Sequence, residues 1–205
     1  MDEKDKNTGP RSYEIFIFIV FTLVWVWSWW QPANPQNWFL ENKIVFFSLP
    51  LIFLILWRIP LSKLAFSSIA LFLVLHLIGA HYNYGSVPLG ATLGNVFKMG
   101  GNLYDKFVHF FFGFLIVYPI NELISRILNL KSFWNYFISF NIILAWSALY
   151  EIIEWLSVFG IDPHLAYLFI GGNDPFDTTK DMAVAGLGAL LALCLVALFK
   201  KVETK

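Results

Sequence analysis

Charged side chains are scarce in this chain. Of its 205 residues only 14% are Asp, Glu, Lys or Arg, whereas 58% are hydrophobic and 19% are aromatic. A soluble domain usually contains about 25% charged residues, so this composition excludes an ordinary soluble domain and indicates an integral membrane protein. Basic and acidic residues are equal in number, 14 of each. The chain therefore lacks the cationic excess of a nucleic-acid-binding protein, and we expect no nucleic acid among its partners.

Cysteine is almost absent as well. Cys194 is the single cysteine, which excludes an intrachain disulfide and any metal cluster held by several cysteines. Because it lies within an apolar run, we expect it to act as a small buried hydrophobic residue. The chain also lacks an HExxH zinc motif and an internal repeat, so no particular metal is indicated and an inverted-repeat transporter is disfavoured.

Long apolar segments dominate the rest of the sequence, and none of them alternates like a strand of a membrane barrel. A helix of about 20 residues crosses the hydrocarbon core of a bilayer. The sequence therefore predicts an all-α, polytopic bundle of six transmembrane helices, formed by residues 13–200 and flanked by polar tails at 1–12 and 201–205. The expected spans are residues 13–30, 44–57, 64–80, 104–123, 134–159 and 182–199. The Gly-rich stretch 85–101 is expected to be a flexible lid or a re-entrant loop.

Basic residues indicate how the six spans are oriented. When the spans are threaded through a bilayer, one side receives ten Lys and Arg residues, at the two termini and in the second and fourth connections. The opposite side receives four: Lys43, Lys98, Lys106 and Lys180. Cytoplasmic loops are enriched in Lys and Arg, so both termini are predicted to be cytoplasmic.

Acidic residues and histidines gather where the predicted spans meet the outer side. Asp105 and His109 are four residues apart and share one face of a helix, whereas Lys106 is expected to point elsewhere. Glu151 and Glu154 are three apart, and Asp177 and Asp181 precede the last span. With this threading, all of them fall at the extracytoplasmic end. Ionisable residues within a membrane are costly unless they pair or face a polar cavity.

Two interpretations of these residues stay open. Asp105 and His109 could be metal ligands or a carboxylate that orients an imidazole base, or they could simply satisfy each other. Glu151 and Glu154 could supply a general acid or a metal site, or form a structural pair with a lysine.

Several other polar or small residues have plainer expectations. Asp177 could cap the last helix. His76 is expected to be a buried, hydrogen-bonded histidine, and His164 a surface residue. Glu122 is expected to pair with Arg126 four residues later. A stripe of small residues, Ala185, Gly188, Ala189 and Ala192, is suited to close helix packing.

Four motifs carry a resemblance to a known family: HLIGAHYNYGSVP, NLYDKFVHFFFGF, ALYEIIEWLSVFG and DPFDTTKDM. In these motifs the chain resembles the YjdF family of bacterial inner-membrane proteins, whose function is uncharacterised, and more distantly the VanZ-type proteins linked to glycopeptide resistance. The resemblance implies a bacterial inner-membrane location and hints at cell-envelope chemistry. The chain departs from the family pattern at one of these positions. Lys106 stands where the family usually has arginine, and an arginine side chain binds anions differently from a lysine.

The resemblance carries over a set of residues from the motifs: His81, Tyr82, Tyr84, Asp105, His109, Glu151, Glu154, Trp155, Asp177 and Asp181. Together with the residue patterns it suggests a membrane enzyme that hydrolyses a lipid or lipid-linked envelope molecule with the help of a divalent metal. The candidate catalytic residues are Asp105, His109, Glu151, Glu154 and Asp181. The candidate metal ligands are Asp105, His109, Glu151 and Asp181. The candidate substrate-binding residues are His76, His81, Tyr82, Tyr84, Lys106, Trp155 and Asp177.

Two other functions remain compatible with the sequence. One is a non-catalytic binding or accessory protein for an amphipathic envelope ligand. The other is a small transporter coupled to protons or ions. Membrane lipids are expected partners in all three cases, and the sequence leaves the oligomeric state open.

Overall fold

The computed structural model describes residues 12–128, 130–157, 159 and 174–203. In these residues every regular element is a helix, and no strand occurs. This confirms the all-α fold. The helices are α1 (Ser12–Trp29), α2 (Pro35–Arg58), α3 (Lys63–His81), α4 (Pro88–Phe97), α5 (Tyr104–Ile127), α6 (Ser132–Ser157) and α8 (Asp177–Glu203).

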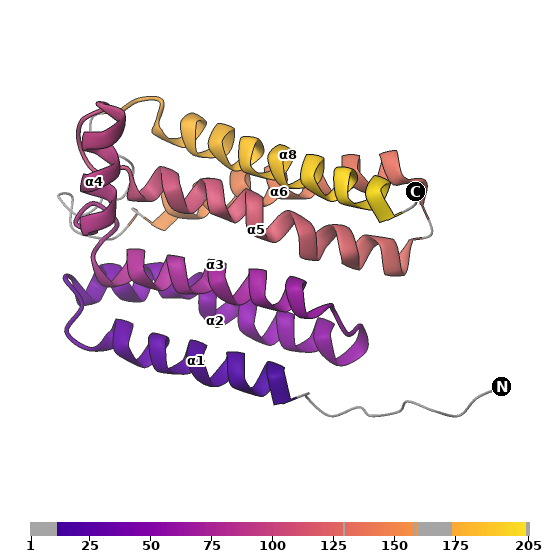
Figure 1. Cartoon of the computed structure of the whole chain (residues 1–205). Helices are drawn as coiled ribbons and strands as arrows, with labels where there is room; N and C mark the ends of the chain where they lie inside the picture. Colours follow the sequence, from indigo (N-terminus) through magenta and orange to yellow (C-terminus); the bar gives the residue numbers. More distant parts are fainter. Residues whose placement is uncertain (1–11, 129, 158, 160–173, 204–205) are drawn as a thin grey trace.

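The long helices form one bundle with two groups (Figure 1). The first three helices lie together, and α5, α6 and α8 form the second group. Helix α3 contacts α1, α2 and α5, whereas α5 contacts α3, α6 and α8, so α3 and α5 join the two groups. Helix α1 begins and α8 ends at the same end of the bundle, and the short helix α4 runs across the opposite end.

Five helices are long and apolar enough to cross a membrane: α1, α3, α5, α6 and α8. Their outward faces carry large apolar side chains, such as Phe16 and Leu23, which are 60% and 66% exposed. The sixth expected span, residues 44–57, lies within α2. Helix α2 has 24 residues and extends about 36 Å, so it is long enough to cross, but it is not among the five candidate spans. The coarser conclusion, a multi-pass helical membrane protein, is confirmed.

Polar side chains fix the helices at the end of the bundle where α1 begins. Ser62 caps α3, where its hydroxyl oxygen accepts a hydrogen bond from the backbone N–H of Ala65 (3.2 Å). The same hydroxyl donates to Oε2 of Glu122 on α5 (2.6 Å), and Glu122 also accepts from Arg126 (2.6 Å). The predicted pair of Glu122 and Arg126 is confirmed, and it also ties α3 to α5.

Helices α5 and α8 pack unusually closely because small residues meet at their contact. A Cβ atom placed on Gly113 would lie 1.8 Å from the carbonyl oxygen of Ala185, and one on Gly188 would lie 2.1 Å from that of Phe110. The predicted role of the small stripe on α8 is thereby confirmed. His109 and Asp181 each lie one helical turn before this contact, so the close packing brings the two side chains opposite each other.

Two sequence expectations are wrong. Residues 85–101 do not form a loop throughout, because Pro88 starts a helix that Gly90 and Gly94 allow to pack tightly. A Cβ on Gly90 would lie 1.7 Å from Oδ1 of Asn102, so the glycines anchor α4 instead of making it flexible. Cys194 is exposed rather than buried, since it lies on the outer face of α8, where an apolar side chain can face lipid.

Candidate functional site

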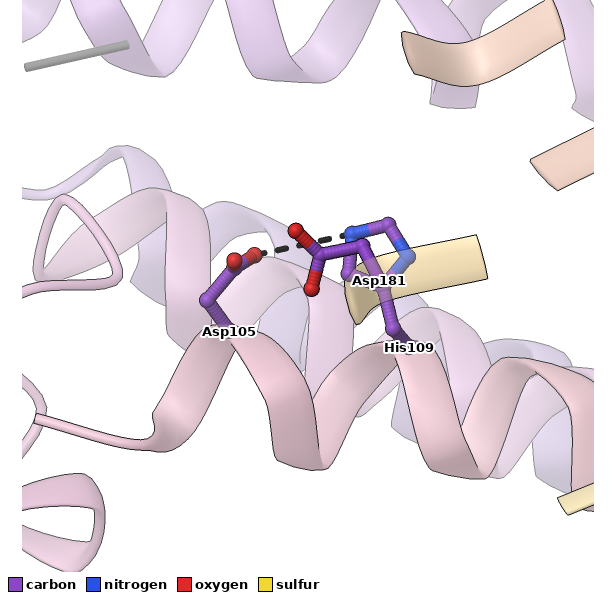
Figure 2. Close-up of side chains that lie close together, drawn as sticks. All are labelled: Asp105, His109 and Asp181. Atoms are coloured by element: carbon purple, nitrogen blue, oxygen red, sulfur yellow. Dashed lines mark ion pairs between the residues drawn. The ribbon is translucent and has the colours of Figure 1, made fainter. Parts of the chain in front are cut away.

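Three potential metal ligands meet at the end of the bundle where α4 lies. Asp105 and His109 come from the first two turns of α5, and Asp181 comes from the second turn of α8. Each residue offers one ligand atom, and these three atoms all lie within 4.8 Å of one another. Figure 2 shows the three side chains pointing toward one another. Asp181 is 2% exposed and His109 is 7% exposed, so most of this group is shielded from solvent.

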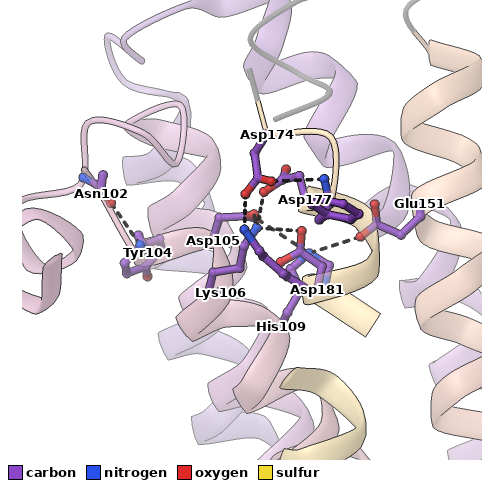
Figure 3. A network of polar contacts seen from close by, with 11 residues as sticks. Asn102, Tyr104, Asp105, Lys106, His109, Glu151, Asp174, Asp177 and Asp181 are labelled. Atoms are coloured by element: carbon purple, nitrogen blue, oxygen red, sulfur yellow. Dashed lines mark hydrogen bonds and ion pairs between the residues drawn. The ribbon is translucent and has the colours of Figure 1, made fainter. Parts of the chain in front are cut away.

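Lys106 occupies the centre of the surrounding ion pairs (Figure 3). Its Nζ atom lies 3.1 Å from Oδ2 of Asp105 and 2.8 Å from Oδ2 of Asp181, and it also binds Oδ1 of Asp177. The expectation that Lys106 points elsewhere is wrong, because its long side chain reaches the carboxylates that α8 brings alongside. Three carboxylates hold its ammonium group, which argues against a role in binding an anionic substrate.

The carboxylates keep oxygen atoms that Lys106 does not use. Oδ1 of Asp181 and Oε1 of Glu151 are buried and make no hydrogen bond in the described part of the chain. Oε1 of Glu151 lies 3.8 Å from Nε2 of His109, and Oδ1 of Asp105 lies 3.6 Å from the same atom. These distances exceed hydrogen-bond length. The imidazole and the spare oxygens thus face one another across a small gap without being bonded.

We refer to Asp105, Lys106, His109, Glu151, Asp177 and Asp181 as the carboxylate cluster. It contains four carboxyl groups and one ammonium group, so with all of them ionised three negative charges are in excess, and bound protons or a divalent cation would reduce that excess. Carboxylate and imidazole ligands suit zinc, manganese or magnesium. Ligands at about 2.1 Å from such an ion lie about 3 to 3.4 Å apart, so a bound ion would draw the three side chains slightly together.

Glu41 is a buried carboxylate near this site that the sequence expectations missed. It lies on α2, is 6% exposed, and accepts a hydrogen bond from the hydroxyl of Tyr150 on α6 (3.0 Å). The ring of Tyr150 in turn lies edge-on to that of His109, with centroids 5.7 Å apart. In the sequence, the feature that could have indicated Glu41 is its position as an acidic residue just before the apolar run that begins at residue 44.

His76 belongs to a separate, fully bonded network. Its Nε2 atom donates to the carbonyl oxygen of Glu41 (3.1 Å), so Nδ1 accepts from the hydroxyl of Tyr84 (2.6 Å). Burial raises the pKa of Tyr84 well above its usual value, and the nearby charge of Glu41 adds to this effect. The hydroxyl therefore keeps its proton and remains a donor. The expectation of a buried, hydrogen-bonded His76 is confirmed, and neither nitrogen is left over to bind a ligand.

Three other predicted substrate-binding residues lie outside the carboxylate cluster. His81 donates from Nδ1 to the carbonyl oxygen of Ser28 (3.0 Å), and the ring of Tyr82 packs edge-on against it at 4.6 Å. Both therefore link α3 to α1. Trp155 is 56% exposed and packs against Phe159. A role for any of the three in substrate binding stays a prediction.

Two predicted residues remain, Asp177 within the cluster and Glu154 on α6. Asp177 starts α8 and binds Lys106, and the partly buried Glu154 experiences the negative charges of Glu41 and Asp105. Asp174 forms an ion pair with Lys180 (2.5 Å), and this hydrogen bond lowers the pKa of Asp174. The prediction for His164 lies outside the described residues.

Comparison with known proteins places the chain in a family. Residues 13–202 match the model of the family described as "Predicted membrane protein (DUF2238)", and the chain belongs to this family. It is also 28% identical, over 182 residues, to the inner membrane protein YjdF of Escherichia coli, an alignment that covers 88% of this chain and 87% of that protein. No solved structure matches the chain. The similarity to YjdF confirms the family resemblance and a multi-pass inner-membrane location.

Proposed function

We propose that this protein is a metal-dependent membrane hydrolase that acts on a lipid or a lipid-linked molecule of the cell envelope. The observation that carries the proposal is the convergence of Asp105, His109 and Asp181 from two helices, with ligand atoms within 4.8 Å of one another. Catalytic zinc sites commonly use three protein ligands and leave one position open for water. A divalent ion held this way would lower the pKa of that water and supply a hydroxide nucleophile.

Glu151 is the best candidate for a general acid or base. Its Oε1 atom lies 3.8 Å from Nε2 of His109 and makes no hydrogen bond in the described residues. The residue is buried, with 7% of its surface exposed. A carboxyl group in such a position could take a proton from the attacking water and return it to the leaving group. Lys106 is proposed to position Asp105 and Asp181 rather than to bind substrate.

The proposed orientation places this site on the outer side of the membrane. The start of α1 and the end of α8 share one end of the bundle (Figure 1), which agrees with an even number of crossings and requires α2 to cross as well. If the ten Lys and Arg residues of that side are cytoplasmic, the carboxylate cluster opens toward the outer leaflet. An amphipathic substrate could then reach it sideways from the lipid.

Transport is supported less well than hydrolysis. A proton or ion relay needs polar groups across the whole bundle, but the middle of the second helix group is filled by Val117, Ile143 and Ala189, each 0% exposed. The binding or accessory function shares the metal site with the hydrolase but predicts no product.

The first test is elemental analysis of the protein purified in mild detergent. We expect about one equivalent of a divalent metal in the wild type and its loss in Asp105→Asn and Asp181→Asn. Asp174→Asn is the matched control, because this exposed carboxylate pairs with Lys180 and should leave the metal in place. Absence of metal in the wild type, after separate addition of zinc, manganese and magnesium, would contradict the proposal.

The second test separates hydrolysis from binding. The protein is reconstituted with bacterial lipid extract, and water-soluble products are followed by mass spectrometry. Glu151→Gln should keep the metal but lower product formation by about 100-fold or more. Equal product formation with and without the wild-type protein would leave a metal-binding accessory protein as the better description.

A further inference from the structure

Helix α4 differs from the other described helices in its direction. It is a 10-residue helix, and it runs across the end of the bundle while the long helices run along it (Figure 1). Membrane-spanning helices tilt on average by about 20° from the bilayer normal. A helix that crosses their ends therefore lies close to the plane of the membrane, at the level of the lipid headgroups.

One face of α4 packs against the protein. Gly90 and Gly94 are the two buried residues of this helix, and they lie one turn apart on the same face. A Cβ on Gly94 would lie 2.1 Å from the carbonyl oxygen of Gly101, and the N–H of Leu103 donates to the carbonyl oxygen of Gly90 (3.0 Å). The glycines thus fix the rotation of α4 about its own axis.

This fixed rotation leaves an apolar face uncovered. Leu89, Leu93 and Val96 follow one another at spacings of four and three residues, which places them on one side of a helix. Leu89 is 45% exposed, Val96 is 68% exposed, and the adjoining Phe97 is 64% exposed. Ala91 and Asn95, four residues apart, are exposed on a different side, whereas Thr92 lies one turn before Val96 at the edge of the apolar face. The helix therefore has a glycine face, an apolar face and a polar face.

We propose that α4 is an interfacial helix whose apolar face inserts into the lipid leaflet at the carboxylate-cluster end of the bundle. Amphipathic helices lie in the membrane plane with the apolar face about 5 to 10 Å into the boundary of headgroups and acyl chains. The polar face of α4 would then meet water. Lys98 follows Phe97 at the end of the helix, and its ammonium group can reach the lipid phosphates while its stem stays among apolar groups.

Phospholipid is favoured over a protein partner by this division into three faces. The boundary between polar and apolar surroundings runs along the length of α4, as it does along a helix at a membrane surface. The inference does not depend on a metal or on catalysis, and it would hold for a purely structural carboxylate cluster. With this placement, α4 lies beside the path that an amphipathic molecule would take from the lipid leaflet to the carboxylate cluster.

The test measures how deeply single labels on α4 enter the lipid. In a Cys194→Ser background, a fluorescent NBD group is attached to cysteine at Val96 or at Ala91, and the protein is placed in nanodiscs of phosphatidylethanolamine and phosphatidylglycerol. Both positions are exposed, so the label displaces no packed side chain. Quenching by a doxyl group near the top of the acyl chain should be about twofold stronger at V96C than at A91C, and quenching by aqueous iodide should show the reverse order.

A second matched pair, Phe97→Cys and Asn95→Cys, repeats the comparison at two further positions on opposite sides of the helix. Equal iodide quenching at the apolar and polar positions of both pairs would overturn the proposal, because α4 would then be in water. Protection of V96C from both quenchers would also overturn it, since a protein surface rather than lipid would cover that face.

Discussion

Replacing Gly188 with alanine should separate α5 from α8 and open the candidate site. The ideal Cβ of an alanine at this position would lie 2.1 Å from the carbonyl oxygen of Phe110, whereas ordinary contact begins at 3.4 Å, which is 1.3 Å more. The obstructing atom belongs to a helix backbone, so it cannot move away by a change of rotamer. Insertion of atoms into a well-packed contact costs about 1 to 3 kcal/mol.

Gly186→Ala is a control on the same helix. Its Cβ would lie 3.1 Å from Cδ2 of Leu144, a side-chain methyl group that can shift by a few tenths of an ångström. Alanine is favoured over glycine within a helix by about 0.5 to 1 kcal/mol. Because this gain is common to both variants, we expect their free energies of unfolding to differ by the packing cost of about 1 to 3 kcal/mol, with Gly188→Ala the less stable.

The measurement is thermal unfolding of both variants in the same detergent, followed by circular dichroism. For a chain of this size, the expected difference corresponds to midpoints roughly 2 to 12 °C apart. Gly188→Ala should also bind less divalent metal while still folded, because Asp181 would move away from His109. If the two alanine variants unfold at the same temperature, the close packing of α5 and α8 does not determine the stability of this bundle.

Two further substitutions test the polar networks. Lys106→Gln should lower the free energy of unfolding by about 3 to 5 kcal/mol at neutral pH, because buried carboxylates lose their ammonium partner. This loss of stability should shrink at acidic pH, because the carboxylates then take up protons. The control Lys180→Gln, in an exposed ion pair, should change stability little. An equal effect of the two, measured by thermal unfolding, would contradict the central role of Lys106. Tyr84→Phe should lower the free energy of unfolding by about 1 to 3 kcal/mol in the same assay, because Nδ1 of His76 loses its hydrogen-bond donor. The control Tyr82→Phe keeps its ring contact with His81 and should change stability little. Similar losses of stability in both variants would show that the hydroxyl of Tyr84 is dispensable.

Much of the site could be predicted because helical periodicity and membrane threading are simple rules. Asp105 and His109 share a face whenever residues 104–123 are helical, and parity of the crossings brings the start of the last helix to the same end as Asp105. The contact between His109 and Asp181 also needed close helix packing, which the stripe of small residues on α8 indicated. These inferences use only local spacing and the order of the spans.

Other features depend on tertiary contacts that spacing does not reveal. Residues adjacent in sequence do not share a helix face, so Lys106 was expected to point away, yet its long side chain reaches two carboxylates of α8. Glu41 is distant in sequence from Tyr150, and only the packing of the bundle brings them together. The glycines at 90 and 94 suggested flexibility, but each makes room for a neighbouring backbone or side chain and so allows α4 to pack.

The order of the helices makes the carboxylate cluster assemble only after α5 and α6 have been made, because α8 follows both in the chain. Membrane proteins are synthesised from the N-terminus, and domains fold as their segments emerge. Until α8 is inserted, Lys106 has only Asp105 as an ion-pair partner among those described, and the glycine surface of α5 at Gly113 has no helix against it. Entry of α8 then supplies two carboxylates and also covers that surface, so the polar site and the packing of α8 on α5 form in one step.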